Sequence, residues 1–177
     1  MRLMTPGLRK AALTVHVATS VGWLGAVVCF LLLAVAGLTG TSQQLVRSAY
    51  LMMDLIGWAV ILPLSLASLA SGIIQALGTV WGLFRHYWVL IKLIITALAT
   101  ALLLLHLQPV THMAGIASVS DLSPTDMTAM RTQLLADAAA AVLALLVTTV
   151  LSLYKPRGLT KYGRTRNERR QPAGQQP

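Results

Sequence analysis

The strongest constraint in this sequence is a set of four long apolar stretches, at 11–38, 48–77, 86–108 and 131–154. Each is longer than the about 20 residues that an α-helix needs to cross the hydrocarbon core of a bilayer. Only 11% of the residues are charged, whereas 56% are hydrophobic. Because hydrocarbon offers no hydrogen-bond partners, a chain inside it satisfies its backbone by forming helices. The sequence therefore predicts an all-α, four-helix transmembrane bundle.

The positive charge of the chain, +9 at pH 7, is concentrated at its two ends. Three basic residues precede the first apolar stretch, and seven follow Tyr154. The 78–86 loop contains Arg85, and the other two loops contain only Arg47 and Arg131. Loops that stay in the cytoplasm are enriched in Lys and Arg. We therefore expect a multi-pass protein of a bacterial plasma membrane with both termini in the cytoplasm. Charge placed in this way flanks a membrane domain, so we expect no nucleic-acid partner.

The same features divide the chain into three parts. A basic cytoplasmic N-terminus at 1–10 precedes the transmembrane domain at 11–155. The tail at 156–177 is basic and then rich in Gln and Pro. Such a composition cannot bury enough apolar surface to fold, so we expect the tail to be disordered or to lie on anionic lipid head groups.

Two local signals concern the helices themselves. Pro63 lies in the middle of the second stretch and is expected to kink that helix, because proline frees the carbonyl of Ala59. The 108–130 segment is expected to be an external loop. Within it, Ser123 and Pro124 form a helix-start signal, with serine as the N-cap and proline in the first turn.

Each apolar stretch also carries a stripe of polar residues at helical spacing. Lys92 is the clearest member, because an ammonium group facing hydrocarbon costs several kcal/mol unless it snorkels or finds a partner. The stripes are therefore expected to face inward and to give the bundle a polar interior. They contain His16, Ser20 and Trp23 in the first stretch, Asp54, Ser65, Ser68 and Gln75 in the second, Lys92, Thr96 and His106 in the third, and Gln133, Asp137, Thr148 and Ser152 in the fourth.

Depth along the helices sorts the ionisable residues into two layers. Lys92 and His106 are fourteen residues apart on one helix, roughly 21 Å, so they cannot belong to one small site. His16 and Lys92 are expected to share the inner layer. Asp54, His106 and Asp137 are expected to share the outer one, with Asp54 hydrogen-bonded to His106. This outer set could be a network that fixes helix register, or a metal or proton site.

His16 and Lys92 are the main candidates for function. An ionisable residue inside a span is a functional candidate by default, and neutral imidazole is a common metal ligand. Lys92 lies six residues into its helix, so it could instead snorkel toward the interface.

The spacing of these residues resembles two groups of small bacterial membrane proteins. His16-x6-Trp23-x-Gly25 in the first span, followed by Trp88-x3-Lys92 and His106 in the third, is similar to copper-resistance D type domains and to the membrane-bound, haem-containing protoporphyrinogen oxidase family. The resemblance implies that His16, and by the second group Lys92, take part in cofactor binding or activity. Over its whole length, with the block WGLFRHYWVLIK, the chain resembles an uncharacterised bacterial family of small four-span predicted integral membrane proteins.

Three functional hypotheses follow, and whether the protein is an enzyme is left open. The favoured one is a membrane protein that binds haem b, or copper, and has a redox role. Its cofactor would contact His16, Lys92, Trp23 and Gln75, and a metal would contact His106, Asp54 and Asp137. The alternative is a non-catalytic accessory or assembly subunit without a cofactor, in a membrane complex or as a homo-oligomer. The third is a small metal or ion permease.

Overall fold

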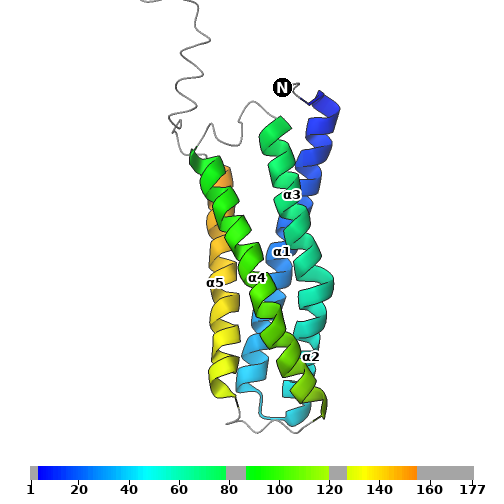
Figure 1. The fold of residues 1–177 in the computed structure, drawn as a ribbon, viewed down its shortest axis with the longest axis vertical. Helices are drawn as coiled ribbons and strands as arrows, with labels where there is room; N and C mark the ends of the chain where they lie inside the picture. The colour runs from blue at the N-terminus through cyan, green and yellow to red at the C-terminus, as the bar shows by residue number, and fades with distance from the viewer. Residues whose placement is uncertain (1–3, 79–86, 120–126, 155–177) are drawn as a thin grey trace, which may run out of the picture.

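The computed structural model describes residues 4–78, 87–119 and 127–154, and these form an antiparallel bundle of four long helical rods (Figure 1). The first rod is α1, and the second contains α2, a π-helical turn η1, and α3. The third and fourth rods are α4 and α5. All four are long and apolar enough to cross a membrane, which confirms the predicted fold class. The elements are α1 (Pro6–Thr39), α2 (Gln43–Ile56), η1 (Gly57–Ile61), α3 (Leu62–Gly78), α4 (Tyr87–Val119) and α5 (Thr128–Tyr154).

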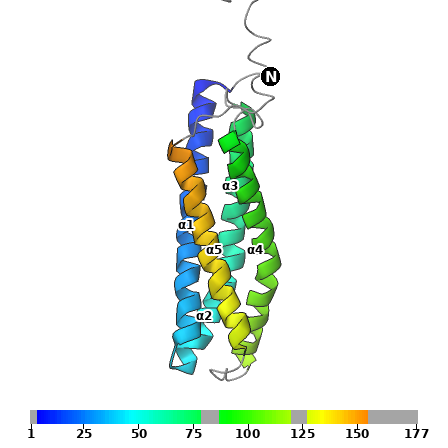
Figure 2. The ribbon, with the colours of Figure 1, turned by 90° about the vertical axis from the view of Figure 1, so that its left-hand side faces the viewer.

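The two ends of the bundle contain different helix ends. The start of α1, the end of α3, the start of α4 and the end of α5 meet at one end, which we call the terminal end (Figure 1, Figure 2). At the other, the hairpin end, α1 turns into α2, and α4 stops where α5 starts. α1 packs on α2, α3 and α5, and α4 packs on the same three helices. The cytoplasmic placement of the terminal end stays a prediction.

Capping explains where the first two helices begin. The Thr5 hydroxyl accepts a hydrogen bond from the amide of Leu8, and Pro6 occupies the first helical turn, where its missing N–H costs nothing. α1 therefore starts inside the segment predicted as a basic N-terminus. Gly40 ends α1, and Ser42 caps α2 through the amide of Leu45. The predicted tail lies outside the described residues.

The second rod accommodates Pro63 with a π-helical turn. Pro63 has no N–H to give to the carbonyl four residues earlier, as predicted. The chain widens in the preceding turn, η1, where the amide of Leu62 bonds to the carbonyl of Gly57, five residues back. Such a turn inserts one extra residue and rotates the helix before it relative to the helix after it. The polar face of α2 is therefore rotated about the rod axis relative to that of α3, compared with its position in a regular helix.

The third rod is longer than the sequence indicates. α4 continues through Pro109 to Val119, so the external loop predicted at 108–130 is wrong for residues 108–119. Val110, Met113 and Ala117 are buried at helical spacing beyond the proline, and this packing offsets the one backbone hydrogen bond that Pro109 removes. The predicted helix start at Ser123 lies outside the described residues.

Two apolar clusters lie inside the bundle at different heights. The middle cluster contains Trp23, Val27, Ile61 and Leu145, with Ala99 packed against it. The hairpin cluster contains Ala34, Val46, Tyr50, Met53, Val110, Met113, Ala117 and Leu134. Arg131, predicted in a loop, is 3% exposed in α5, with its guanidinium carbon 5.8 Å from the centre of the Tyr50 ring.

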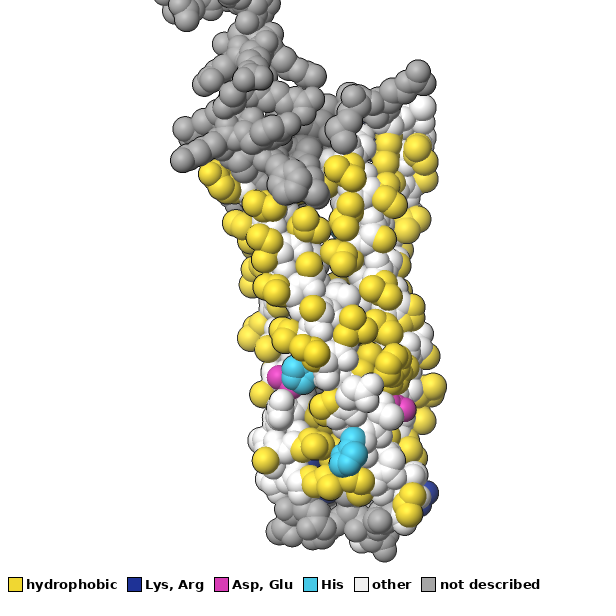
Figure 3. All heavy atoms as spheres, in the orientation of Figure 1, with side chains coloured by type: hydrophobic (Ala, Val, Ile, Leu, Met, Phe, Trp, Pro, Cys, Tyr) yellow, Lys and Arg dark blue, Asp and Glu magenta, His cyan; other side chains and the backbone are white. Residues whose placement is uncertain are grey.

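The exposed surface of α4 and α5 changes character along the bundle, with apolar side chains toward the terminal end and mixed ones toward the hairpin end (Figure 3). We call the region from Tyr87 to His106 on α4, and from Asp137 to Tyr154 on α5, the apolar band. On α4 it spans about 28 Å at helical rise, close to the about 30 Å of a bilayer core. Inside the band the exposed residues include Ile91, Ile94, Leu98, Leu102 and Leu105 on α4, and Leu143, Leu146, Val147, Val150 and Leu153 on α5. Beyond it they include Gln108, Thr111, His112 and Ser118 on α4, which ends on the exposed Val119, and Thr128, Thr132 and Gln133 on α5.

Candidate functional site

His16 is held between α1 and α3 by one of its two ring nitrogens. Its Nδ1 lies 3.1 Å from the backbone oxygen of Ser68 and 3.0 Å from the hydroxyl of Ser71. A carbonyl oxygen can only accept, and the Ser71 hydroxyl itself donates to the same carbonyl, so the hydrogen belongs on Nδ1. The other nitrogen, Nε2, then keeps its lone pair, and it has no hydrogen-bond partner among the residues that the structure describes.

Further polar contacts join α1 to α3 around this histidine. The hydroxyls of Ser20 and Ser68 lie 2.8 Å apart, and the Gln75 amide donates to the carbonyl of Ala12 at 3.0 Å. A side chain at Gly72 would put its Cβ 3.1 Å from the His16 ring. Glycine and serine therefore allow the two helices to approach closely enough for these bonds.

Lys92 is held between α4 and α5. Its ammonium donates to the hydroxyl of Ser152, which in turn donates to the carbonyl of Thr148 at 2.9 Å. The same ammonium lies 5.8 Å from the centre of the Trp88 ring, within the range of a cation–π interaction. Lys92 is thus partnered by protein groups inside the bundle, as the predicted inward stripe requires.

The structure brings His16 and Lys92 into one layer. The middle apolar cluster supplies the reference height, because Trp23, Ile61 and Leu145 pack together there with Ala99. On each rod, the residue seven positions closer to the terminal end lies about 10 Å away at helical rise. These residues are His16, Ser68, Ser152 and Lys92, counted from Trp23, Ile61, Leu145 and Ala99 in that order. The shared height predicted for this pair therefore agrees with the packing of all four rods.

Two other predicted cofactor residues lie outside that layer. Trp23 is two helical turns away in the middle cluster and is only 3% exposed. Gln75 lies two turns from Ser68 in the opposite direction, with its amide bonded to α1. Ser71, which fixes the His16 ring together with Ser68, is the closer polar neighbour.

The predicted outer layer separates into two contacts. The Asp54 carboxylate accepts a hydrogen bond from the Thr111 hydroxyl at 2.6 Å, and the Trp58 indole donates to the same hydroxyl at 3.0 Å. The expected hydrogen bond from Asp54 to His106 is replaced by this contact. Trp58 lies in the π-helical turn, and Asp54 lies in α2 just before it. Thr111 is not among the predicted site residues, because the sequence predicts a loop at 108–130.

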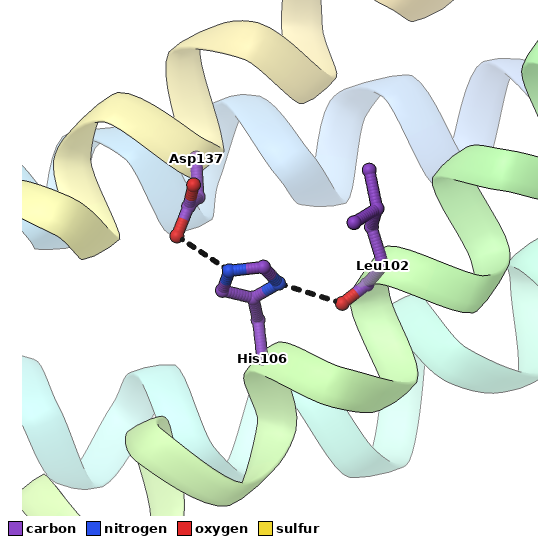
Figure 4. A network of polar contacts seen from close by, with 3 residues as sticks. All are labelled: Leu102, His106 and Asp137. Carbon is purple, nitrogen blue, oxygen red and sulfur yellow. Dashed lines mark hydrogen bonds and ion pairs between the residues drawn. The ribbon is translucent and has the colours of Figure 1, made fainter.

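His106 pairs with Asp137 instead (Figure 4). Its Nε2 lies 2.9 Å from the carboxylate oxygen Oδ2 of Asp137, and its Nδ1 lies 2.7 Å from the backbone oxygen of Leu102. The pair links α4 to α5 at the edge of the apolar band. The described residues contain no group of three or more His, Cys, Asp or Glu side chains placed to hold a metal ion, so the predicted three-residue metal set does not come together.

Comparison with family models, with curated proteins and with solved structures gave no match for this chain. The resemblance noted in the sequence therefore stays a prediction.

Proposed function

We propose that this multi-pass membrane protein binds haem b, which Nε2 of His16 would hold. The observation that supports the proposal is the contact of His16 Nδ1 with the Ser68 carbonyl, which leaves Nε2 available as a ligand. Histidines that ligate a metal almost always donate their other ring N–H to a carbonyl or a carboxylate, and Nδ1 of His16 lies 3.1 Å from the carbonyl of Ser68.

Haem fits this donor set better than copper. A protein copper site takes several side-chain ligands, such as histidine, cysteine and methionine together. The described residues near His16 offer one imidazole, and Cys29 lies thirteen residues farther along α1 with an exposed side chain. Haem brings four porphyrin nitrogens of its own, so one histidine is sufficient.

Lys92 would bind a haem propionate. It lies in the layer of His16, and a lysine ammonium pairs with a carboxylate as a point charge. The Lys92–Ser152 contact would orient the ammonium. When bound, the haem supplies one-electron redox chemistry, while the residues of this chain bind it, orient it and keep it in the apolar band.

The absorbance of the purified protein tests this proposal. We expect a Soret band in protein expressed with haem supplied, and loss of the band in His16→Ala, because the imidazole that would hold the haem is removed. His112→Ala is the matched control, since His112 is an exposed histidine beyond the apolar band, and it should keep the band. A wild-type protein that stays colourless with haem supplied would contradict the proposal.

The strength of haem binding tests the role of Lys92. Lys92→Met keeps the apolar stem but removes the charge, and should weaken haem binding about 10-fold or more, the value of one charged hydrogen bond. Lys92→Arg keeps the cation and should bind more tightly than Lys92→Met. Equal affinities of the two variants in a haem titration would remove Lys92 from the site.

A non-catalytic accessory subunit is the second candidate, and one observation favours it. His16, Gln75 and Lys92 each bond to a neighbouring helix. Such bonds can serve helix packing alone. A stable protein that binds neither haem nor copper would favour this function.

A further inference from the structure

The contact between His106 and Asp137 requires one proton more than a neutral imidazole and an ionised carboxylate carry. Nδ1 of His106 lies 2.7 Å from the carbonyl of Leu102, and a carbonyl only accepts, so Nδ1 carries a hydrogen. With Nδ1 protonated, a neutral ring presents a lone pair at Nε2. An ionised carboxylate also presents lone pairs, so two such groups 2.9 Å apart would repel.

One additional proton removes this repulsion. It makes the ring an imidazolium that donates to the carboxylate, or it makes the carboxyl group a donor to the ring. Asp137 Oδ2 is buried and has no partner other than this ring among the described residues, so its contact depends on that proton. Figure 4 shows both ring nitrogens engaged, one toward Asp137 on α5 and one toward Leu102 on α4.

The position of the pair gives it access to water. The side chains of His106 and Asp137 are 27% and 37% exposed. They lie where the exposed residues of α4 change from Leu102 and Leu105 to Gln108 and Thr111. A group at this boundary can exchange protons with the solution on the hairpin side of the membrane, whereas a group in the middle of the band cannot.

The other ionisable groups of the surrounding helices have different environments. α3 has none in its sequence. Five ionisable residues on the other rods or farther along α4 and α5 lie nearest to the pair in height along the bundle. Cys29 on α1 and His112 on α4 are exposed, and Asp54 on α2 accepts a hydrogen bond from Thr111. Tyr50 and Arg131 lie against each other at the hairpin cluster. Within the described residues, no hydrogen bond or ion pair joins Cys29, Tyr50, Asp54 or His112 to the pair, so His106 and Asp137 are coupled mainly to each other.

We propose that His106 and Asp137 form a binding site for one exchangeable proton, which links α4 to α5 at the hairpin-side edge of the membrane. The link is complete only while one proton is shared. A second proton would remove the anionic partner of the imidazolium, and loss of the shared proton would leave two sets of lone pairs facing each other. Stability should therefore be highest while one proton is shared.

Two variants keep a hydrogen bond at this place without needing the extra proton. In His106→Gln the side-chain amide can donate to the carboxylate, and in Asp137→Asn the amide can donate to the neutral ring. The wild-type protein in lipid nanodiscs should lose about 2–4 °C of Tm on either side of its pH maximum. Both variants should have a flatter Tm profile over the same range. His112→Gln, six residues farther along α4, should keep the wild-type profile.

The protonation of the ring can be measured directly. Nitrogen NMR of the full chain labelled at histidine should show Nδ1 of His106 protonated at every pH, with the signal assigned by its loss in His106→Gln. The Nε2 signal should titrate in the wild-type protein and change in Asp137→Asn. An unprotonated Nδ1, or a pH profile of Tm that persists unchanged in His106→Gln, would overturn the proposal. Neither readout depends on haem, so this test is independent of the proposed function.

Discussion

At the scale of residues, the histidine, lysine and aspartate side chains of the predicted stripes each bond to a neighbouring helix. Each membrane-embedded polar group needs a partner, because hydrocarbon supplies none. Serine and threonine hydroxyls are the commonest partners. Ser71 orients His16, Ser152 accepts from Lys92, and Thr111 connects Trp58 to Asp54. The chemistry available to His16 and Lys92 therefore depends on a neutral hydroxyl on the next helix.

Thr111 offers a test of this dependence. Thr111→Val removes the hydroxyl that accepts from Trp58 and donates to Asp54. We expect the free energy of unfolding to fall by about 1 kcal/mol, because both partners are partly exposed and can bind water instead. Thr132→Val is the matched control, since the hydroxyl of that exposed threonine, within the described part of the chain, bonds to its own helix. Equal thermal stability of the two variants would show that the Trp58–Thr111–Asp54 contact contributes nothing.

At the scale of elements, close helix contacts depend on glycine at positions that face a rigid partner. Gly37 on α1 faces the ring of Tyr50 on α2, and a Cβ there would lie 2.8 Å from a ring carbon. Tyr50 is 1% exposed and cannot move aside without disturbing the hairpin cluster. Gly57 in η1 approaches Leu107 on α4 in the same way, with 2.8 Å from its Cβ position to a leucine methyl. The π-helical turn can lie against α4 because it begins with glycine.

Gly37→Ala should destabilise the protein by about 1–3 kcal/mol, the usual effect of forcing extra volume into a packed core. Gly25→Ala, also in α1, is the control. No atom lies within 4 Å of a Cβ built there, and alanine is a better helix former by about 1 kcal/mol. We expect a Tm equal to or above that of the wild type for Gly25→Ala. A loss of stability of the same size in both variants would show that helix propensity, not contact with Tyr50, governs Gly37.

At the scale of the whole molecule, the bundle is longer than the membrane is thick. The apolar band ends at His106 and Asp137, while α4 runs on to Val119 and packs its buried face on α2. On α4 and α5 the hairpin end thus has an apolar core inside and mainly polar residues outside, whereas α1 and α2 expose Leu32, Val35, Leu45 and Met52 there. We expect this end to project from the bilayer.

Cysteine labelling of whole cells tests both the projection and its direction. In a Cys29→Ser background, Ser118→Cys should react with an impermeant thiol reagent, because Ser118 is exposed beyond the apolar band and basic flanks place the termini in the cytoplasm. Gln176→Cys in the tail should react only after the cells are opened. The reverse pattern would place the hairpin end in the cytoplasm, and protection of both sites would mean that the hairpin end is embedded.

The sequence by itself determined the four spans, the inward direction of Lys92, and the shared layer of His16 and Lys92. Hydropathy, helical rise and the 3.6-residue period are local properties, so heights along a helix can be counted from the residues alone. The partner of each polar group was decided by the tertiary structure. His106 meets Asp137 and not Asp54, because the rotation of each helix about its axis depends on its packing. The extra residue in η1 changes the rotation of α2 relative to α3, and the continuation of α4 through Pro109 changes how far α4 extends. Neither feature follows from a periodic pattern.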